Sequence, residues 1–383
     1  MNHIYLDHNA TTPIHPCVSE VMTRCFESRL ANPASQHQPG RRARKVIEEA
    51  RDYIGDALGA RVSAMDADRL VFTSGGTESN NLALLGLARH SSGNIVISAI
   101  EHPSVVAAAE HLQRLGFQLR RARVTESGVL DLVHFATLVD TETRVASVML
   151  GNNETGVLQP VAEAARICAD LGVPLHTDAV QVVGKLAVDF LSLGIATLSI
   201  AAHKFHGPAG IGALLVRENV ELRPLFYGGF QQVGLRPGTE SVCLAVGMKE
   251  ALRLWSEERD ARSTRMEGLR NLLEQRITDG CPGSVVLGAE VARLPHTANI
   301  AFPGLDRQAI LMALDLAGIA CSTGSACASG SSEPSPVLLA MGCSKAVVDG
   351  SIRISLGALT TPQEIEEAGR RIVKIVNELR GKN

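Results

Sequence analysis

Between residues 70 and 216 the chain alternates short apolar runs with longer segments in which apolar residues recur at helical spacing. Short apolar runs bounded by turn residues are typical of buried strands, and strands that alternate with helices build a mostly parallel sheet with helices on both faces. We therefore expect an α/β fold with a seven-stranded sheet. The expected strands are 70–73, 94–98, 118–121, 144–150, 174–177, 197–201 and 213–216, and the expected helices between them are 79–89, 104–115, 130–137 and 161–170.

Polar residues follow three of these strands directly. The stretch Thr73-Ser74-Gly75-Gly76-Thr77 leads from a strand into a helix start. Asp178 lies just past the strand at 174–177, and Lys204 lies just past the strand at 197–201. A glycine turn at a helix start is typical of a phosphate site, although this stretch lacks the glycine spacings of ATP-binding and dinucleotide-binding loops. Ligands of open α/β sheets bind at the carboxyl ends of strands. We expect these residues to share one site.

Lys204 stands before the turn residues Gly207-Pro208, and the apolar run after the turn is expected to be a strand that returns. A partly desolvated lysine becomes a nucleophile toward carbonyls, as a Schiff base with pyridoxal phosphate (PLP) requires. An acid such as Asp178 would keep the pyridine nitrogen of PLP protonated. The structural alternative is a lysine at a strand end that extends its amine into solvent.

Composition limits the classes of function. The chain has 383 residues, enough for two domains, and a net charge of −3 with few aromatic residues, which does not suggest a nucleic-acid partner. Eight cysteines without C-x-x-C pairs argue against a zinc site and for a reducing compartment. The start has no signal-peptide pattern, and no apolar run approaches the ~18 residues of a membrane span. We expect a cytoplasmic protein with no membrane partner and no intrinsic metal.

Several motifs in order resemble the class V, fold-type I PLP enzymes. These are T-S-G-G-T-E-S-N, E-H, N-N-E-T-G, H-T-D-A-V-Q and H-K-x-x-G-P-x-G-I-G; with S-T-G-S-A-C they resemble specifically a cysteine desulfurase of the NifS/IscS type. The resemblance extends from Tyr5 to Gly357. It implies that PLP is the cofactor and that L-cysteine is converted to L-alanine. It also implies that the sulfur passes, as a persulfide of Cys327, to an iron–sulfur scaffold or another acceptor protein.

The resemblance also implies roles for individual residues. Lys204 carries PLP, Cys327 is the sulfur nucleophile, and His102 stacks on the pyridine ring and moves protons. A persulfide on Cys327 could be a transient ligand of an iron–sulfur cluster. The residues expected to bind the cofactor are Gly76, Thr77, His102, Asn153, Asp178, Gln181, His203, Lys204 and Thr239, and those expected to bind the substrate are Arg353, Asn32 and Asn153.

Three of these roles have further consequences or alternatives. Thr239 is expected to reach the phosphate in a partner subunit, which implies a homodimer. Arg353 is expected to clamp the substrate carboxylate, with a structural salt bridge as its alternative. Taken without the resemblance, Cys327 lies in a small, polar, Gly-rich stretch, where an incidental surface cysteine is the alternative.

One position departs from the pattern of the family. Ala201 stands where the family usually has a serine on the PLP phosphate, so we expect weaker PLP retention, by about 1 kcal/mol for one lost hydrogen bond. We expect a large PLP-binding domain at 15–255. Residues 1–14 and 256–383 should form a smaller α+β domain, which carries the Cys327 loop at about 321–335. A long helical region at 242–279 should leave the large domain.

Alternative functions remain open at this point. A selenocysteine lyase would use the same residues, and a class V aminotransferase would use the same lysine without a reactive thiol. A third class is a non-catalytic sulfur carrier or scaffold-binding homologue, which the presence of Lys204, Asp178 and Arg353 disfavours.

Overall fold

The computed structural model of the chain describes residues 3–62, 67–88, 92–324 and 333–381. Its centre is a seven-stranded sheet in the order β2-β8-β7-β6-β5-β3-β4. The strands are β2 (Arg69–Thr73), β3 (Asn94–Ser98), β4 (Gln118–Ala122), β5 (Thr143–Ser147), β6 (Leu175–Asp178), β7 (Thr197–Ala201) and β8 (Gly212–Val216). Strand β8 is antiparallel to β2 and β7, and the other neighbouring strands are parallel. The predicted α/β fold is confirmed.

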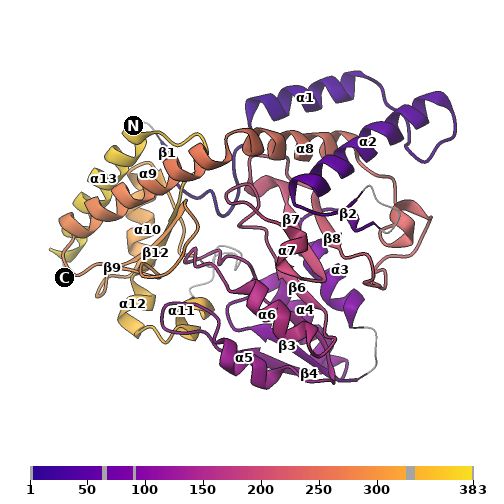
Figure 1. Cartoon of the computed structure of the whole chain (residues 1–383). Coiled ribbons are helices and arrows are strands. Elements are labelled where there is room, and N and C mark those ends of the chain that lie inside the picture. Colours follow the sequence, from indigo (N-terminus) through magenta and orange to yellow (C-terminus); the bar gives the residue numbers. More distant parts are fainter. Residues whose placement is uncertain (1–2, 63–66, 89–91, 325–332, 382–383) are drawn as a thin grey trace.

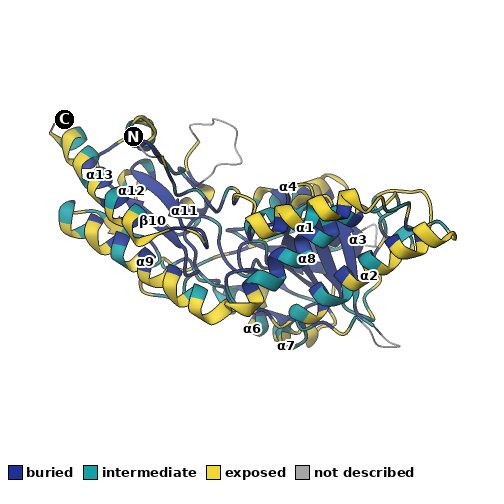
Figure 2. Ribbon diagram, turned by 90° about the horizontal axis from the view of Figure 1, so that it is seen from above, coloured by how far each residue is buried: buried dark blue, intermediate teal, exposed yellow. Residues whose placement is uncertain are grey.

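Helices cover both faces of this sheet because successive strand residues point in opposite directions. Leu70 and Phe72 belong to a core shared with α1, α2, α6 and α8, whereas Val71 between them belongs to a core shared with α3 and α4. Figure 2 shows these helices with their buried sides toward the sheet. The bounds are α1 (Pro16–Glu27), α2 (Gln38–Ala57), α3 (Gly76–Leu87), α4 (Pro103–Arg114), α5 (Leu132–Leu138), α6 (Val161–Ala169), α7 (Phe190–Leu193) and α8 (Val242–Glu257).

A second, smaller unit holds both ends of the chain (Figure 1). It contains an antiparallel sheet β12-β10-β9 and a parallel pair of β1 with β11. Its elements are β1 (Ile4–Tyr5), α9 (Arg259–Gly280), β9 (Val285–Val286), β10 (Thr297–Ala301), α10 (Arg307–Leu316), β11 (Ile319–Ala320), α11 (Pro336–Ala340), α12 (Lys345–Asp349), β12 (Ser351–Ser355) and α13 (Pro362–Arg380). Ile4 and Leu6 pack into the same core as Ile300 and Ile352. The division into residues 15–255 and the rest stays a prediction.

Two predicted elements differ from the structure. The helical region expected at 242–279 is two helices, because the backbone at Glu258 leaves the helical region, with φ −118° and ψ 17°. Helix α8 packs on α1 and α2, whereas α9 packs on α13. Strand β5 ends at Ser147 rather than at residue 150, although Val148 and Leu150 still donate backbone hydrogen bonds to β6. No helix within the described ranges combines the length and the hydropathy that crossing a bilayer requires.

Candidate active site

A cavity of about 1010 Å³ lies at the carboxyl ends of the parallel strands, between the large sheet and the smaller unit. Its lining includes most of the residues that the sequence predicts for a site. The predicted residues that line it are Gly76, Thr77, His102, Asn153, Asp178, Gln181, His203, Lys204 and Arg353, and Ala201 lines it as well. The structure therefore brings together residues spread over 278 positions of the chain, from 76 to 353.

Three predicted residues are not found there. Asn32 is exposed, with its Oδ1 accepting the backbone N–H of Ala34, and it is not among the lining residues. Thr239 is exposed and also lies away from this cavity. Cys327 lies outside the described residues. The described residues on either side of that stretch, Gly324 and Glu333, both line the cavity.

One end of the cavity is built by the start of α3. Its first N–H groups have no partner within the helix and, with the helix dipole, favour an anion. At Gly76 a Cβ would lie 2.8 Å from a Val180 methyl carbon, so any other residue would require Val180 to move. Ala201, at the end of β7, faces this turn, with its Cβ 3.7 Å from the same Cβ position. His203 is largely buried beside Lys204, and burial followed by the Lys204 charge lowers its pKa to about 4.

The other polar groups of the cavity are held by specific hydrogen bonds. Asp178 is buried, and its carboxylate accepts from Asn80 Nδ2 at 2.7 Å and from the Val180 N–H at 2.9 Å. His102 caps α4: its Nδ1 accepts the Ser104 N–H at 3.1 Å, which places the proton of the neutral ring on Nε2. Gln181 donates from Nε2 to the Asn9 carbonyl at 3.0 Å, while its Oε1 is buried and accepts no hydrogen bond from the described residues.

Lys204 lies in a short 3-10 turn, η1 (Ala202–Lys204), that follows β7 directly. Its Nζ donates to the backbone carbonyls of Asn9 at 2.6 Å and Ala10 at 2.8 Å. The amine is therefore not extended into solvent, which was the structural alternative. It is held at the cavity wall by the segment that follows β1.

Arg353 lies on β12 and is 2% exposed. Its guanidinium donates to Asp7 Oδ1 at 2.7 Å, to the Asn153 carbonyl at 3.1 Å and to the Gly324 carbonyl at 3.2 Å. The salt bridge considered as an alternative is thus present. It does not use all the donors, however, because the Arg353 Nε is buried and has no acceptor among the described residues. A buried N–H group of an arginine that lines a cavity is a ready donor for a carboxylate.

The sequence analysis missed three acidic groups of this site. Asp7 pairs with Arg353, and Glu154 accepts the Ser335 hydroxyl at 2.6 Å. Glu101 accepts the Met149 N–H at 2.7 Å, and burial, together with the nearby charge of Asp178, raises its pKa to about 8. Two of them belong to motifs named in the sequence analysis: Glu101 is part of E-H, and Glu154 is part of N-N-E-T-G. Their burial beside other charges could not be read from those motifs.

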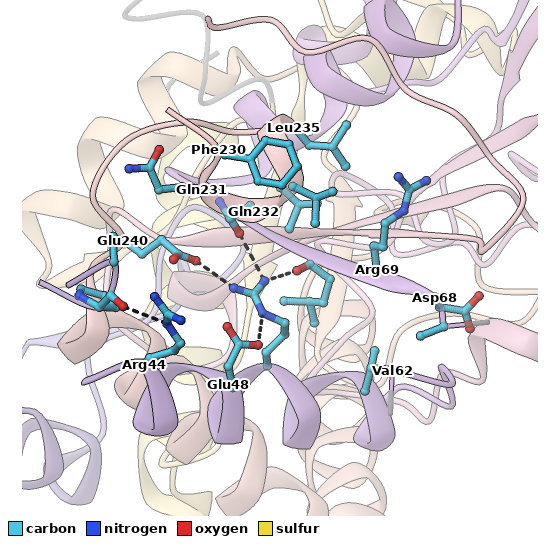
Figure 3. Close-up of a pocket in the computed structure, with 17 residues that line it drawn as sticks. Arg44, Glu48, Val62, Asp68, Arg69, Phe230, Gln231, Gln232, Leu235 and Glu240 are labelled. Atoms are coloured by element: carbon cyan, nitrogen blue, oxygen red, sulfur yellow. Dashed lines mark hydrogen bonds and ion pairs between the residues drawn. The ribbon is translucent and has the colours of Figure 1, made fainter. Parts of the chain in front are cut away.

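A second cavity, of about 600 Å³, lies between α2, β2 and residues 230–240 (Figure 3). Arg51 joins its walls through ion pairs with Glu48 at 3.0 Å and Glu240 at 2.8 Å. The Gln232 amide pairs with both backbone groups of Phe72 on the edge strand β2, at 2.7 and 2.9 Å. These contacts fix the segment that carries Thr239.

The chain resembles known proteins over nearly its whole length. The model of the aminotransferase class-V family matches residues 4–367. The cysteine desulfurase NifS of Azotobacter vinelandii is 38% identical over 99% of this chain and 94% of the relative, and the cysteine desulfurase IscS of Dictyoglomus turgidum is 38% identical over 98% and 95%. A solved NifS-like protein from Rickettsia africae is 34% identical over 98% of this chain and all of the other, with a TM-score of 0.89.

These matches cover both the large sheet and the smaller unit. The chain therefore belongs to the aminotransferase class-V family, among the cysteine desulfurases of the NifS/IscS type.

Proposed function

We propose that this protein is a PLP-dependent cysteine desulfurase, which converts L-cysteine to L-alanine and passes the sulfur to an acceptor protein such as an iron–sulfur scaffold. The observation that carries the proposal is one cavity lined by an amine, a buried carboxylate and a buried guanidinium, those of Lys204, Asp178 and Arg353. Amine and carboxylate match the cofactor of the family, and the guanidinium matches the carboxylate of an amino-acid substrate.

The cavity offers a partner for each reactive part of PLP. The start of α3 at Gly76 and Thr77 would hold the phosphate, with His203 beside it. Asp178 would keep the pyridine nitrogen protonated, Gln181 and Asn153 would face the phenolic oxygen, and Lys204 would carry the cofactor. Bound PLP supplies an electron sink for the negative charge that develops at the substrate Cα.

The side chains of this chain then bind and deprotonate the substrate. Arg353 would bind the substrate carboxylate, for which its Nε–H, used by no described residue, is a donor, while Asp7 accepts from Nη2. The Lys204 amine would take the Cα proton as a general base. The His102 ring, whose Nδ1 accepts the Ser104 N–H, would exchange protons with the reacting groups.

Cys327 would carry the sulfur. Its thiolate attacks the sulfur of the substrate, the Cβ–S bond of the substrate breaks, and the new S–S bond leaves a persulfide on Cys327. The remaining three-carbon unit is released as L-alanine after protonation. The position of Gly324 and Glu333 in the cavity wall supports a Cys327 that reaches the substrate.

We further propose a homodimer in which Thr239 contacts the PLP phosphate of the partner subunit. Phe226, Tyr227 and Phe230, on the segment before Thr239, are 52%, 88% and 82% exposed in the single chain. Large apolar side chains exposed together are typical of an interface. The ion pair of Arg236 with Glu78 at 2.8 Å ties this segment to the first turn of α3.

Two variants test the proposed reaction. Cys327→Ser should keep the absorbance of bound PLP and lose the release of sulfide from L-cysteine. Lys204→Ala should lose the absorbance of lysine-linked PLP. Full sulfide release by Cys327→Ser would contradict the proposal, and activity of that variant with consumption of glutamate or pyruvate would instead indicate an aminotransferase.

A further inference from the structure

Asn9 is the point where the segment after β1 meets the active-site cavity. It is 1% exposed and lies between the smaller sheet and the cavity wall. Its backbone N–H donates to Ser355 Oγ on β12 at 2.9 Å. The neighbouring Asp7 is bridged to the same residue of β12. The backbone on the N-terminal side of Asn9 is therefore attached to the smaller sheet.

The side chain of Asn9 is fixed by partners on three sides. Its Oδ1 accepts from His296 Nε2 at 2.8 Å, and its Nδ2 donates to Thr297 Oγ1 at 2.9 Å and to the Asn153 carbonyl at 3.1 Å. Because Oδ1 is only an acceptor, the hydrogen of the His296 ring is on Nε2. Because the amide is buried and both its Oδ1 and its Nδ2 have hydrogen-bond partners, it has a single orientation.

The backbone of Asn9 faces the other way, toward the cofactor-binding residues. Its carbonyl accepts both from Lys204 Nζ at 2.6 Å and from Gln181 Nε2 at 3.0 Å, and the next carbonyl, of Ala10, accepts from Lys204 Nζ at 2.8 Å. Asn9 thus touches three residues of the expected cofactor site, namely Lys204, Gln181 and Asn153.

From this arrangement we propose that Asn9 is a positioning residue for the Lys204 amine; the inference rests on the proposed function of that amine. Its locked side chain fixes two backbone carbonyls that receive the amine whenever it is not joined to the cofactor. The two carbonyls accept hydrogen bonds from the amine at fixed positions on one side of the cavity wall. The pair of carbonyls therefore decides the direction in which the amine can attack a carbonyl or take up a proton.

The experiment measures the rate at which PLP attaches to the cofactor-free protein, followed by absorbance after mixing. Asn9→Ala removes the side-chain hydrogen bonds to His296, Thr297 and Asn153, so the two carbonyls and the amine lose their fixed position. We expect attachment to slow by about tenfold, and kcat for sulfide release to fall by about tenfold to a hundredfold with a smaller change in KM. The KM for L-cysteine should change less because Asp7 still holds Arg353.

Asn94→Ala is the matched control. Asn94 is also a buried asparagine, 2% exposed, with hydrogen bonds to Asp140 at 2.8 Å and Thr143 at 2.7 Å, but it starts β3 at the opposite end of the strands from the cavity. It should lower stability and leave the rate of PLP attachment unchanged. An Asn9→Ala protein that attaches PLP at the wild-type rate, or an Asn94→Ala protein slowed to the same degree, would overturn the proposal.

Should Asn9→Ala fail to fold, Thr297→Val serves in its place, because it removes one acceptor of the Asn9 amide and keeps the side-chain shape. Attachment should then slow by about two- to fivefold, and an unchanged rate would count against the proposal. A wild-type protein that attaches PLP but releases no sulfide from L-cysteine would refute the proposed function. The attachment rates would still decide the role of Asn9.

Discussion

Glu101 gives the sharpest test of the electrostatics of this site. Its carboxyl group is fully enclosed beside the cavity and accepts the Met149 N–H through Oε1. Burial, with the charge of Asp178 as the second cause, raises its pKa from 4.5 to about 8. At neutral pH Glu101 is therefore a neutral acid beside Asp178. Replacing Glu101 by Gln keeps the shape and the acceptor for Met149 but removes the ionisation.

The size of the effect follows from proton linkage. Between pH 4.5 and about 8 the folded protein keeps a proton on Glu101 that the unfolded chain releases. The unfolding free energy of the wild type therefore decreases as pH rises through this window, by at most about 1.4 kcal/mol per pH unit from this group. From pH 4.5 to 7 the loss amounts to about 3 kcal/mol. The Glu101→Gln protein does not lose this unfolding free energy, because the glutamine amide does not ionise.

The assay is urea unfolding of the cofactor-free proteins, followed by circular dichroism at pH 6, 7 and 8. The unfolding free energy of Glu101→Gln minus that of the wild type should grow by about 1 kcal/mol with each pH unit, since Glu101 in the folded protein is only half ionised at about pH 8. Glu290→Gln, at an exposed position, is the control and should give a difference that does not depend on pH. Parallel curves for Glu101→Gln and the wild type would refute the assignment of a raised pKa to Glu101.

Three further predictions concern single residues. His176 is buried, and burial lowers its pKa to about 3, so the unfolding free energy of the wild type should fall as pH drops below 6.5. In His176→Gln that fall should be shallower by up to about 1.4 kcal/mol per pH unit. Urea unfolding at pH 5 and 6 measures the difference. Arg353→Lys should raise KM for L-cysteine by about tenfold to a hundredfold at unchanged PLP absorbance, because lysine cannot bind a carboxylate in two places. Ala201→Ser should tighten PLP binding by about fivefold, or about 1 kcal/mol, measured by equilibrium dialysis, and an unchanged affinity would contradict the role given to this position.

Local patterns were sufficient for most of the sheet. The predicted strands 94–98 and 197–201 coincide with β3 and β7, because a strand buried on both faces is a continuous apolar run whose ends are marked by turn residues. The break between α8 and α9 was missed for the opposite reason. Helical periodicity continues through Glu258, and the change of direction there follows from two different packing partners, α1 and α2 for one helix and α13 for the other.

In the active site, too, some features followed from local sequence patterns and others from packing. The sequence by itself determined Lys204, Asp178 and the start of α3, because each follows a strand whose carboxyl end must face the same edge of a parallel sheet. Only the tertiary structure decided that Asp7 pairs with Arg353, 346 residues away, and that Lys204 donates to the carbonyl of Asn9, 195 residues away. The first contact depends on how the two ends of the chain meet within the smaller unit, and the second on how that unit packs against the large sheet. Neither helical nor strand periodicity carries that information.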